Sequence, residues 1–255
     1  MRVQVHPGIP DSLLDVGRYD RIAELARLDS PGLQVADLAT GFGRTVRAML
    51  KVAAQPVRIH AVDTASGLDD EVLQDERVRS VLADIDGTLP FPDAGLDRVI
   101  SLNVAEHVGD PAAHLVECHR ILKPGGRLVL AHSDWDTALF TSDDDMLTRR
   151  LVDRFVSLVP SWAEHSDGFM GRKLLGLAAD SPFEVDSVAT WADCHRRFDE
   201  DSVGWKVAMG VLAACREDAE LAAQAAAWVQ SLGRLAEEGR FLFAVTDVAL
   251  VLRRP

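Results

Sequence analysis

Short runs of apolar residues alternate with amphipathic segments along the first half of the chain, the pattern of strands joined by helices. The apolar runs are 33–38, 57–62, 78–83, 97–102 and 127–131. A helical pattern at 44–52 follows the first run, and Asp110 with Pro111 gives a helix-start signal before the last. Strands separated by helices pair in parallel through right-handed crossovers. The pattern therefore predicts an α/β fold with a doubly wound sheet.

The second half of the chain is richer in helical patterns. Helical periodicity covers 146–159, 171–179, 203–215 and 221–235. The segments 183–191 and 240–252 have the composition of strands, because β-branched and other apolar residues dominate them. We expect this half to supply the substrate side of any site that the first half forms.

Polar residues stand at or near the carboxyl ends of four of the predicted strands. Asp37 lies near the end of the first strand, and Asp63, Asp84 and Asn103 follow the next three. Ligands of open α/β sheets bind beyond the carboxyl ends of the strands. We therefore expect these four side chains to face one crevice.

A glycine turn joins the first strand to its helix. Gly41 and Gly43 let backbone N–H groups approach a ligand, and the helix that follows favours a polar or anionic group there. A nicotinamide-binding turn needs a third glycine at position 46, which is Val46, so a dehydrogenase is disfavoured. The sequence also has no P-loop, and His114 and Cys118 lack a second ligand pair for a metal.

Composition narrows the range of partners. The chain of 255 residues has a net charge of −13, which disfavours nucleic acid, and it has no apolar run long enough for a membrane span. Its amino-terminal residues lack the apolar core of a signal peptide. Three widely spaced cysteines predict reduced thiols and a cytoplasmic protein. They are Cys118, Cys194 and Cys215.

Four segments in this order resemble class I S-adenosylmethionine-dependent methyltransferases, the group that includes ubiquinone and menaquinone biosynthesis enzymes and many small-molecule methyltransferases. They are VADLATGFG at 35–43, TLPFPDAGLD at 88–97, NVAEHV at 103–108 and LKPGGRL at 122–128. Ala39 stands where the family usually has its first glycine.

The resemblance implies a seven-stranded sheet, mostly parallel with its last strand antiparallel, and helical cap insertions. Residues 1–30 would form an N-terminal helical lid segment, and residues 31–135 a cofactor-binding Rossmann-like core. Residues 136–255 would supply cap helices and the last two strands. The helices at 200–237 would be inserted between those strands as a lid over the cofactor.

The resemblance also implies S-adenosylmethionine as cofactor and S-adenosylhomocysteine as product. Asp37 would orient the ammonium group of the cofactor, and Asp63 would accept both ribose hydroxyls. Asp84 would meet the adenine amino group while Ile85 packs on the ring. The full predicted cofactor set is Tyr19, Asp37, Ala39, Thr40, Gly41, Gly43, Asp63, Thr64, Asp84, Ile85, Asn103 and Val104.

Three further residues are candidates for substrate binding or catalysis. Trp135 is the predicted substrate residue, with an ordinary core position as the alternative. If the acceptor must lose a proton, His132 or His107 is the predicted base. The expected function is methylation of a small molecule, such as a secondary metabolite, at oxygen, nitrogen or aromatic carbon. The competing interpretation is a catalytically silent protein that binds the cofactor or a partner.

Overall fold

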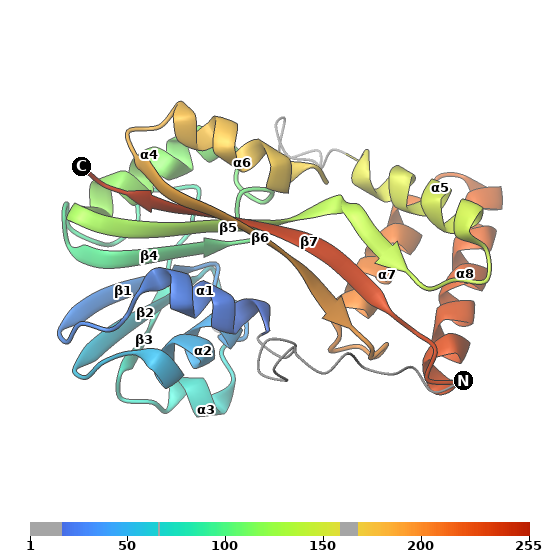
Figure 1. The fold of residues 1–255 in the computed structure, drawn as a ribbon, viewed down its shortest axis with the longest axis horizontal. Helices are drawn as coiled ribbons and strands as arrows, with labels where there is room; N and C mark the ends of the chain where they lie inside the picture. Colours follow the sequence, from blue (N-terminus) through green and yellow to red (C-terminus); the bar gives the residue numbers. More distant parts are fainter. Residues whose placement is uncertain (1–16, 66, 159–167) are drawn as a thin grey trace, which may run out of the picture.

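The computed structural model describes residues 17–65, 67–158 and 168–255. Its one described sheet has seven strands in the order β3-β2-β1-β4-β5-β7-β6 (Figure 1). The strands are β1 (Leu33–Leu38), β2 (Val57–Asp63), β3 (Val78–Leu82), β4 (Leu96–Leu102), β5 (Leu122–Phe140), β6 (Glu184–His195) and β7 (Phe243–Arg253). The helices are α1 (Arg18–Ala26), α2 (Arg44–Val52), α3 (Asp70–Leu73), α4 (Pro111–Ile121), α5 (Asp145–Val156), α6 (Met170–Ala179), α7 (Val203–Ala214) and α8 (Ala219–Glu237).

The pairing of the strands confirms the predicted fold class. Strands β1 to β5 pair in parallel, while β7 is antiparallel to both of its neighbours, β5 and β6. Because β6 and β5 are both antiparallel to β7, they run in the same direction. The carboxyl ends of β1, β4, β5 and β6 therefore point toward the same side of the molecule.

Helices cover both faces of the sheet, as a doubly wound fold requires. One buried apolar cluster joins α4 and α6 to one face, and a second joins α1 and α2 to the other. Helix α4 begins as predicted, because the Asp110 carboxylate accepts hydrogen bonds from the backbone N–H groups of Ala112 and Ala113 and Pro111 is the first helical residue.

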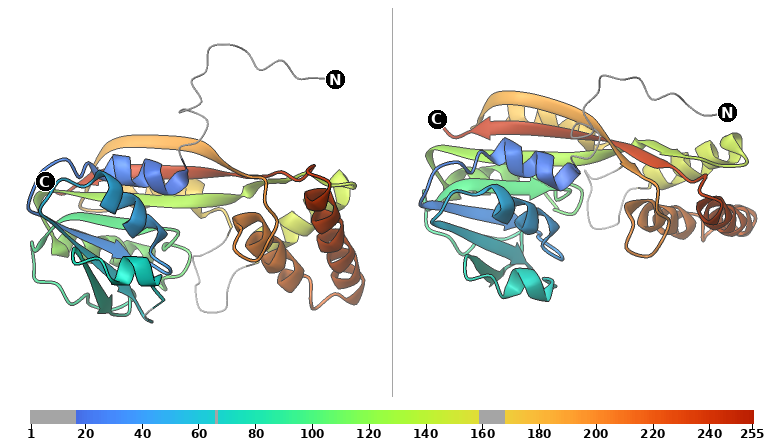
Figure 2. Two further views of the ribbon diagram at one scale, coloured as in Figure 1. Left: turned by 90° about the horizontal axis from the view of Figure 1, so that it is seen from below. Right: turned by 60° about the horizontal axis from the view of Figure 1, so that its bottom comes forward.

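A third buried cluster forms the cap. Helices α5, α7 and α8 gather around the far ends of β5, β6 and β7 (Figure 1). Helices α7 and α8 follow β6 and precede β7 in the chain, which confirms the predicted insertion between the last two strands. In the turned views, α7 and α8 lie on the same side of the extended strands as β1, β2 and β3 (Figure 2).

The prediction of strand five was wrong in length. Strand β5 runs over Leu122–Phe140, whereas the apolar pattern covers only 127–131. The extra residues pair with β7 as far as Phe140 and Phe243, across an irregularity between Asp134 and Leu139. Pairing with the long strand β7 therefore stabilises a polar stretch whose own sequence would predict a loop.

The observed ends of other strands and helices differ from the predicted ends by a few residues. Strand β6 continues to His195 rather than 191, and the closing strand begins at Phe243 rather than 240. Helix α5 ends at Val156, although the periodicity extends to 159. Residues 1–16 of the predicted lid segment lie outside the described residues, so α1 is its described part. None of the helices in the described ranges is long and apolar enough to cross a membrane.

Candidate active site

The glycine turn lies at the carboxyl end of β1 and adopts left-handed backbone conformations. Gly41 has φ 54° and Gly43 has φ 81°, which glycine tolerates without steric strain. A Cβ at position 43 would also lie 2.9 Å from the Leu68 side chain. Ala39, at the position of the usual first glycine, has φ 52° and carries the strain of that conformation. The sequence therefore keeps the shape of the turn despite this alanine.

Asp63 closes the turn from the end of β2. Its Oδ2 accepts a hydrogen bond from the backbone N–H of Gly41 at 2.8 Å, and its Oδ1 accepts one from Thr64 at 2.8 Å. The side chain is only partly buried. Each carboxylate oxygen has further acceptor capacity, so Asp63 can bind the turn and accept from two ligand hydroxyls as well.

Asp37 lies beneath the turn rather than on its surface. It is 2% exposed, and the Thr40 hydroxyl donates a hydrogen bond of 2.6 Å to its Oδ2. Burial raises the pKa of Asp37 to about 7, and the Thr40 hydrogen bond opposes this rise. The carboxyl group therefore takes up a proton near neutral pH.

A cleft of about 190 Å³ opens beside the turn. It brings together five of the predicted residues, and α1, β4 and the cap helix α7 add others. The predicted residues in its lining are Tyr19, Ala39, Thr40, Gly41 and Asn103, and the others are Arg18, Phe42, Arg44, Thr45, Leu102 and Lys206. The cap reaches this cleft directly, because Lys206 Nζ lies 5.7 Å from the centre of the Phe42 ring.

Other predicted residues are not part of this cleft lining. Asp84 and Ile85 follow β3 beside Asp63, where the backbone N–H of Ala83 donates to the carbonyl oxygen of Asp63. Asp84 is exposed and Ile85 is half-buried against the core. Val104 is fully buried. The structure thus puts the residues predicted for adenine next to Asp63, on the far side of the turn from Arg18.

A buried network of polar groups forms one wall of the cleft. Arg18 Nη2 donates to Asp247 Oδ1 at 2.9 Å and to Ser133 Oγ at 3.1 Å. Arg18 Nε is buried and has no hydrogen-bond partner among the described residues. Asn103, with φ 55°, accepts a hydrogen bond of 2.9 Å from the backbone N–H of Ser133. Burial raises the pKa of Asp247, and the Arg18 charge opposes the rise.

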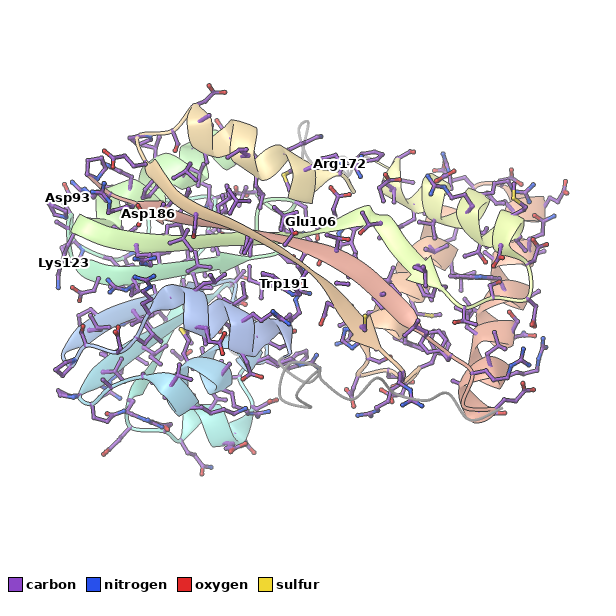
Figure 3. The ribbon with its side chains drawn as sticks, in the orientation of Figure 1. Asp93, Glu106, Lys123, Arg172, Asp186 and Trp191 are labelled. Atoms are coloured by element: carbon purple, nitrogen blue, oxygen red, sulfur yellow. The ribbon has the colours of Figure 1, made fainter. Side chains whose placement is uncertain are left out.

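Glu106 joins the three residues that were predicted for chemistry and substrate binding. Its Oε2 accepts a hydrogen bond of 2.9 Å from Trp135 Nε1. Its Oε1 lies 3.7 Å from His132 Nε2 and 3.5 Å from His107 Nε2. Glu106 and Trp191 both lie near the middle of the molecule, where the sheet passes from the core to the cap (Figure 3).

The two histidines differ sharply in accessibility. His132 is fully buried, its Nδ1 lies 2.7 Å from the carbonyl oxygen of Ser133, and burial lowers its pKa. The His107 side chain is 59% exposed. Trp135 is 8% exposed and packs in the cap cluster, 6.5 Å from the Phe155 ring centre. This packing agrees with the alternative interpretation of Trp135 as a core residue. The catalytic roles of His132 and His107 stay predictions.

Sequence reasoning missed Arg18, Glu106 and Lys206. Glu106 stands in the recognised NVAEHV segment, so that segment was a usable signal. Arg18 stands in an amphipathic helix and Lys206 in a mainly apolar one, and only the tertiary structure brings them to the cleft. Among the described residues, no group of three His, Cys, Asp or Glu is arranged to hold a metal ion.

Comparison with known proteins finds a family match over the part of the chain that carries the glycine turn, Asp63 and Asn103. Residues 36–130 match the family model described as a methyltransferase domain. The chain is 32% identical over 183 residues to the uncharacterized 37.1 kDa protein in transposon TN4556 of Streptomyces fradiae, covering 68% of this chain and 50% of that protein. It is 33% identical over 143 residues to a ubiquinone biosynthesis O-methyltransferase of Xanthomonas oryzae, covering 52% and 56%. The chain thus spans about half the length of these curated relatives.

Solved structures share the fold at low identity. Geranyl diphosphate methyltransferase in complex with SAM has a TM-score of 0.55 at 14% identity, with 98% of this chain and 93% of that chain covered. The [4+2]-cyclase SpnF has a TM-score of 0.56 at 19% identity, with 93% and 79% covered. These likenesses concern the fold. Residues 36–130 therefore match a methyltransferase domain, and the chain has the fold of class I S-adenosylmethionine-dependent methyltransferases.

Proposed function

We propose that the protein transfers a methyl group from S-adenosylmethionine to an oxygen, nitrogen or aromatic carbon of a small molecule. The observation that carries the proposal is the cleft that Arg18, the glycine turn and Asn103 form beside the Asp63 carboxylate. It offers the Arg18 guanidinium at one end and a partly exposed carboxylate near the other. A ligand with a carboxylate at one end and ribose hydroxyls toward the other fits this distribution of charge.

Different residues around the cleft would bind different parts of the cofactor. Asp63 would accept the ribose hydroxyls, and Asp84 with Ile85 would hold the adenine ring. Arg18 would bind the methionine carboxylate, and Asn103 and Asp37 would orient the ammonium group. S-adenosylmethionine supplies an electrophilic methyl group when it is bound.

A small-molecule acceptor is favoured by charge and by the cap. The chain carries a net charge of −13, which disfavours nucleic acid as substrate. The cap contacts the glycine turn through Lys206, and the carbonyl oxygen of Asp201 accepts a hydrogen bond from Arg44 at 3.3 Å. Such a cap encloses the reacting groups and excludes water. We further propose a secondary-metabolite acceptor, methylation in the cytoplasm, and no membrane partner.

Calorimetry with S-adenosylmethionine and S-adenosylhomocysteine tests this proposal. We expect both to bind, and we expect tritium to pass from the labelled methyl group of S-adenosylmethionine to molecules in the small-molecule fraction of a bacterial extract. Absence of binding would remove the proposal.

The likeness to the cyclase SpnF favours one alternative, namely a protein that keeps the fold and catalyses another reaction or none. Binding of the cofactor without transfer of tritium to any acceptor would favour that alternative.

A further inference from the structure

Two residues at the end of β6 form an ordered histidine–carboxylate pair that no role described above uses. His195 Nε2 lies 2.8 Å from Asp193 Oδ2. Asp193 is 7% exposed, whereas the His195 side chain is 27% exposed. A carboxylate only accepts hydrogen bonds, so Nε2 carries the hydrogen and Nδ1 is left with a free lone pair.

The pair is tied to the wall of the cleft. Side chains two residues apart on a strand point to the same face, and here that face is the one covered by α1. Arg18 Nε lies 4.0 Å from Asp193 Oδ2, and Arg18 also donates to Asn103 Oδ1 at 3.4 Å. The Asp193 carboxylate and Asn103 are therefore linked through one buried guanidinium.

The position of His195 is also where the core meets the cap. It is the last residue of β6, whose carboxyl end points the same way as those of β1 and β4. The loop after it leads to Asp201, which contacts Arg44, and then to α7 with Lys206 in the cleft lining. The His195 ring centre lies 6.0 Å from that of Phe243 in the cap cluster. His195 thus stands at the start of the connection from β6 to α7, the cap helix whose Lys206 lines the cleft.

The two histidines predicted as bases, His132 and His107, do not combine an oriented ring with an open ring nitrogen. His132 is fully buried, with Nδ1 at the Ser133 carbonyl and Nε2 facing Glu106. His107 is exposed, and its separation of 3.5 Å from Glu106 is long for an orienting hydrogen bond. A general base needs an open lone pair and a partner that fixes its ring. His195 has both.

We propose that His195 is the catalytic proton acceptor of the methyl-transfer reaction and that Asp193 is its positioning residue. The proposal rests on the proposed function and deepens it, because it names the acceptor class: a hydroxyl or amine group that must lose a proton. The acceptor lone pair forms the new bond to the methyl carbon while sulfur keeps the pair of the broken bond, so one proton must leave the acceptor. His195 Nδ1 takes that proton, Asp193 stabilises the imidazolium, and the proton then passes to solvent.

Four variants test the proposal in the whole protein: His195→Gln, His195→Ala, Asp193→Asn and, as matched control, Cys194→Ser. Cys194 is exposed between the two residues, and its side chain points to the opposite face of β6. Turnover is measured as transfer of tritium from labelled S-adenosylmethionine to the small-molecule fraction of a bacterial extract. Affinity for S-adenosylhomocysteine is measured by calorimetry. The tautomer of His195 is read from ¹H–¹⁵N spectra of the protein without ligand.

We expect His195→Gln to lose about 100-fold or more in turnover while its affinity for S-adenosylhomocysteine changes less than about twofold, since His195 does not line the cleft. Added imidazole should restore turnover to His195→Ala, and Cys194→Ser should behave as the original protein. The free protein should show His195 protonated at Nε2 alone, and Asp193→Asn should show both tautomers.

Three results would overturn the proposal. They are full turnover in His195→Gln, a loss of turnover in His132→Gln or His107→Gln with none in His195→Gln, and a His195 tautomer protonated at Nδ1. If the original protein binds S-adenosylhomocysteine but transfers no methyl group, the proposed function fails, and the role of His195 fails with it. If turnover is seen and survives His195→Gln, only the role of His195 fails.

Discussion

Replacing Arg18 with methionine should expose how much the fold depends on one buried ion pair. Arg18 is 4% exposed and Asp247 is fully buried, with 2.9 Å between Arg18 Nη2 and Asp247 Oδ1. Methionine keeps much of the length and apolar stem of arginine but leaves the Asp247 charge without its partner. Removing one member of a buried pair destabilises a protein by about 3–5 kcal/mol.

The expected change is readily measured. For a chain of this length a loss of 1 kcal/mol lowers Tm by about 2–4 °C, so Arg18→Met should melt roughly 10 °C below the original protein at pH 8. The double variant Arg18→Met with Asp247→Leu removes both charges and should recover most of the loss. Thermal unfolding followed by circular dichroism compares the three proteins.

The loss of stability in Arg18→Met should also depend on pH, being smaller at low pH than at high pH. Burial raises the pKa of Asp247, and Arg18 opposes that rise. Without Arg18 the pKa of Asp247 rises further, so the folded state holds a proton that the unfolded chain releases near pH 4. Stability from such a group is present at low pH and is lost as pH rises through the folded-state pKa. Arg18→Met should therefore be less destabilised at pH 5 than at pH 8. An Arg18→Met protein within about 1 kcal/mol of the original at pH 8 would refute this reasoning.

Three further changes test the turn and the carboxylates beneath it. Asp63→Ala should weaken S-adenosylhomocysteine binding by about tenfold or more, or about 1.4 kcal/mol, measured by calorimetry. Ala39→Gly should stabilise the protein by about 0.5–1 kcal/mol, because it relieves the left-handed strain at φ 52°, measured by urea unfolding. Asp37 has its pKa raised to about 7 by burial, so its stabilising contribution is complete below about pH 4 and lost as pH rises through 7. The stability of Asp37→Asn relative to the original protein should therefore increase between pH 5 and pH 8.

Each of these changes has an outcome that contradicts its physical reason. Unchanged affinity in Asp63→Ala would exclude a ribose-binding role for that carboxylate. A less stable Ala39→Gly protein would mean that the turn carries no relievable strain. A stability difference between Asp37→Asn and the original protein that stays constant from pH 5 to pH 8 would mean that Asp37 titrates at its ordinary pKa.

The sequence predicts the first four strands well because each is a compact apolar run bounded by turn residues. Strand β1 over Leu33–Leu38 matches the predicted range, and β2 and β4 differ by one residue at an end. Strand β5 could not be predicted in full, because residues 132–138 are mostly polar and the strand is held on either side of its irregularity by pairing of 132–134 and 139–140 with β7. A strand stabilised by its partner leaves little trace in its own periodicity.

The same contrast holds in the site. The glycine turn, Asp63 and Asn103 are local features at strand ends, so a parallel sheet is enough to bring them together. The partner of Arg18, by contrast, lies 229 positions away at Asp247. The ring of Trp135 packs with Phe155 from the cap, and its role as a substrate residue stays a prediction. Contacts between residues so far apart in the chain depend on how the helices pack on the sheet, and no motif in this chain predicts that packing.

The length of β5 limits how the cap can move against the core. Because β5, β6 and β7 each continue from the domain core into the cap, with one irregularity in the pairing of β5 between Asp134 and Leu139, the two parts share one sheet. A rotation of the cap away from the core would therefore have to bend these three strands. Helix α8 contributes no residue to the cleft lining, so changes in α8 can alter the cap and leave that lining unchanged.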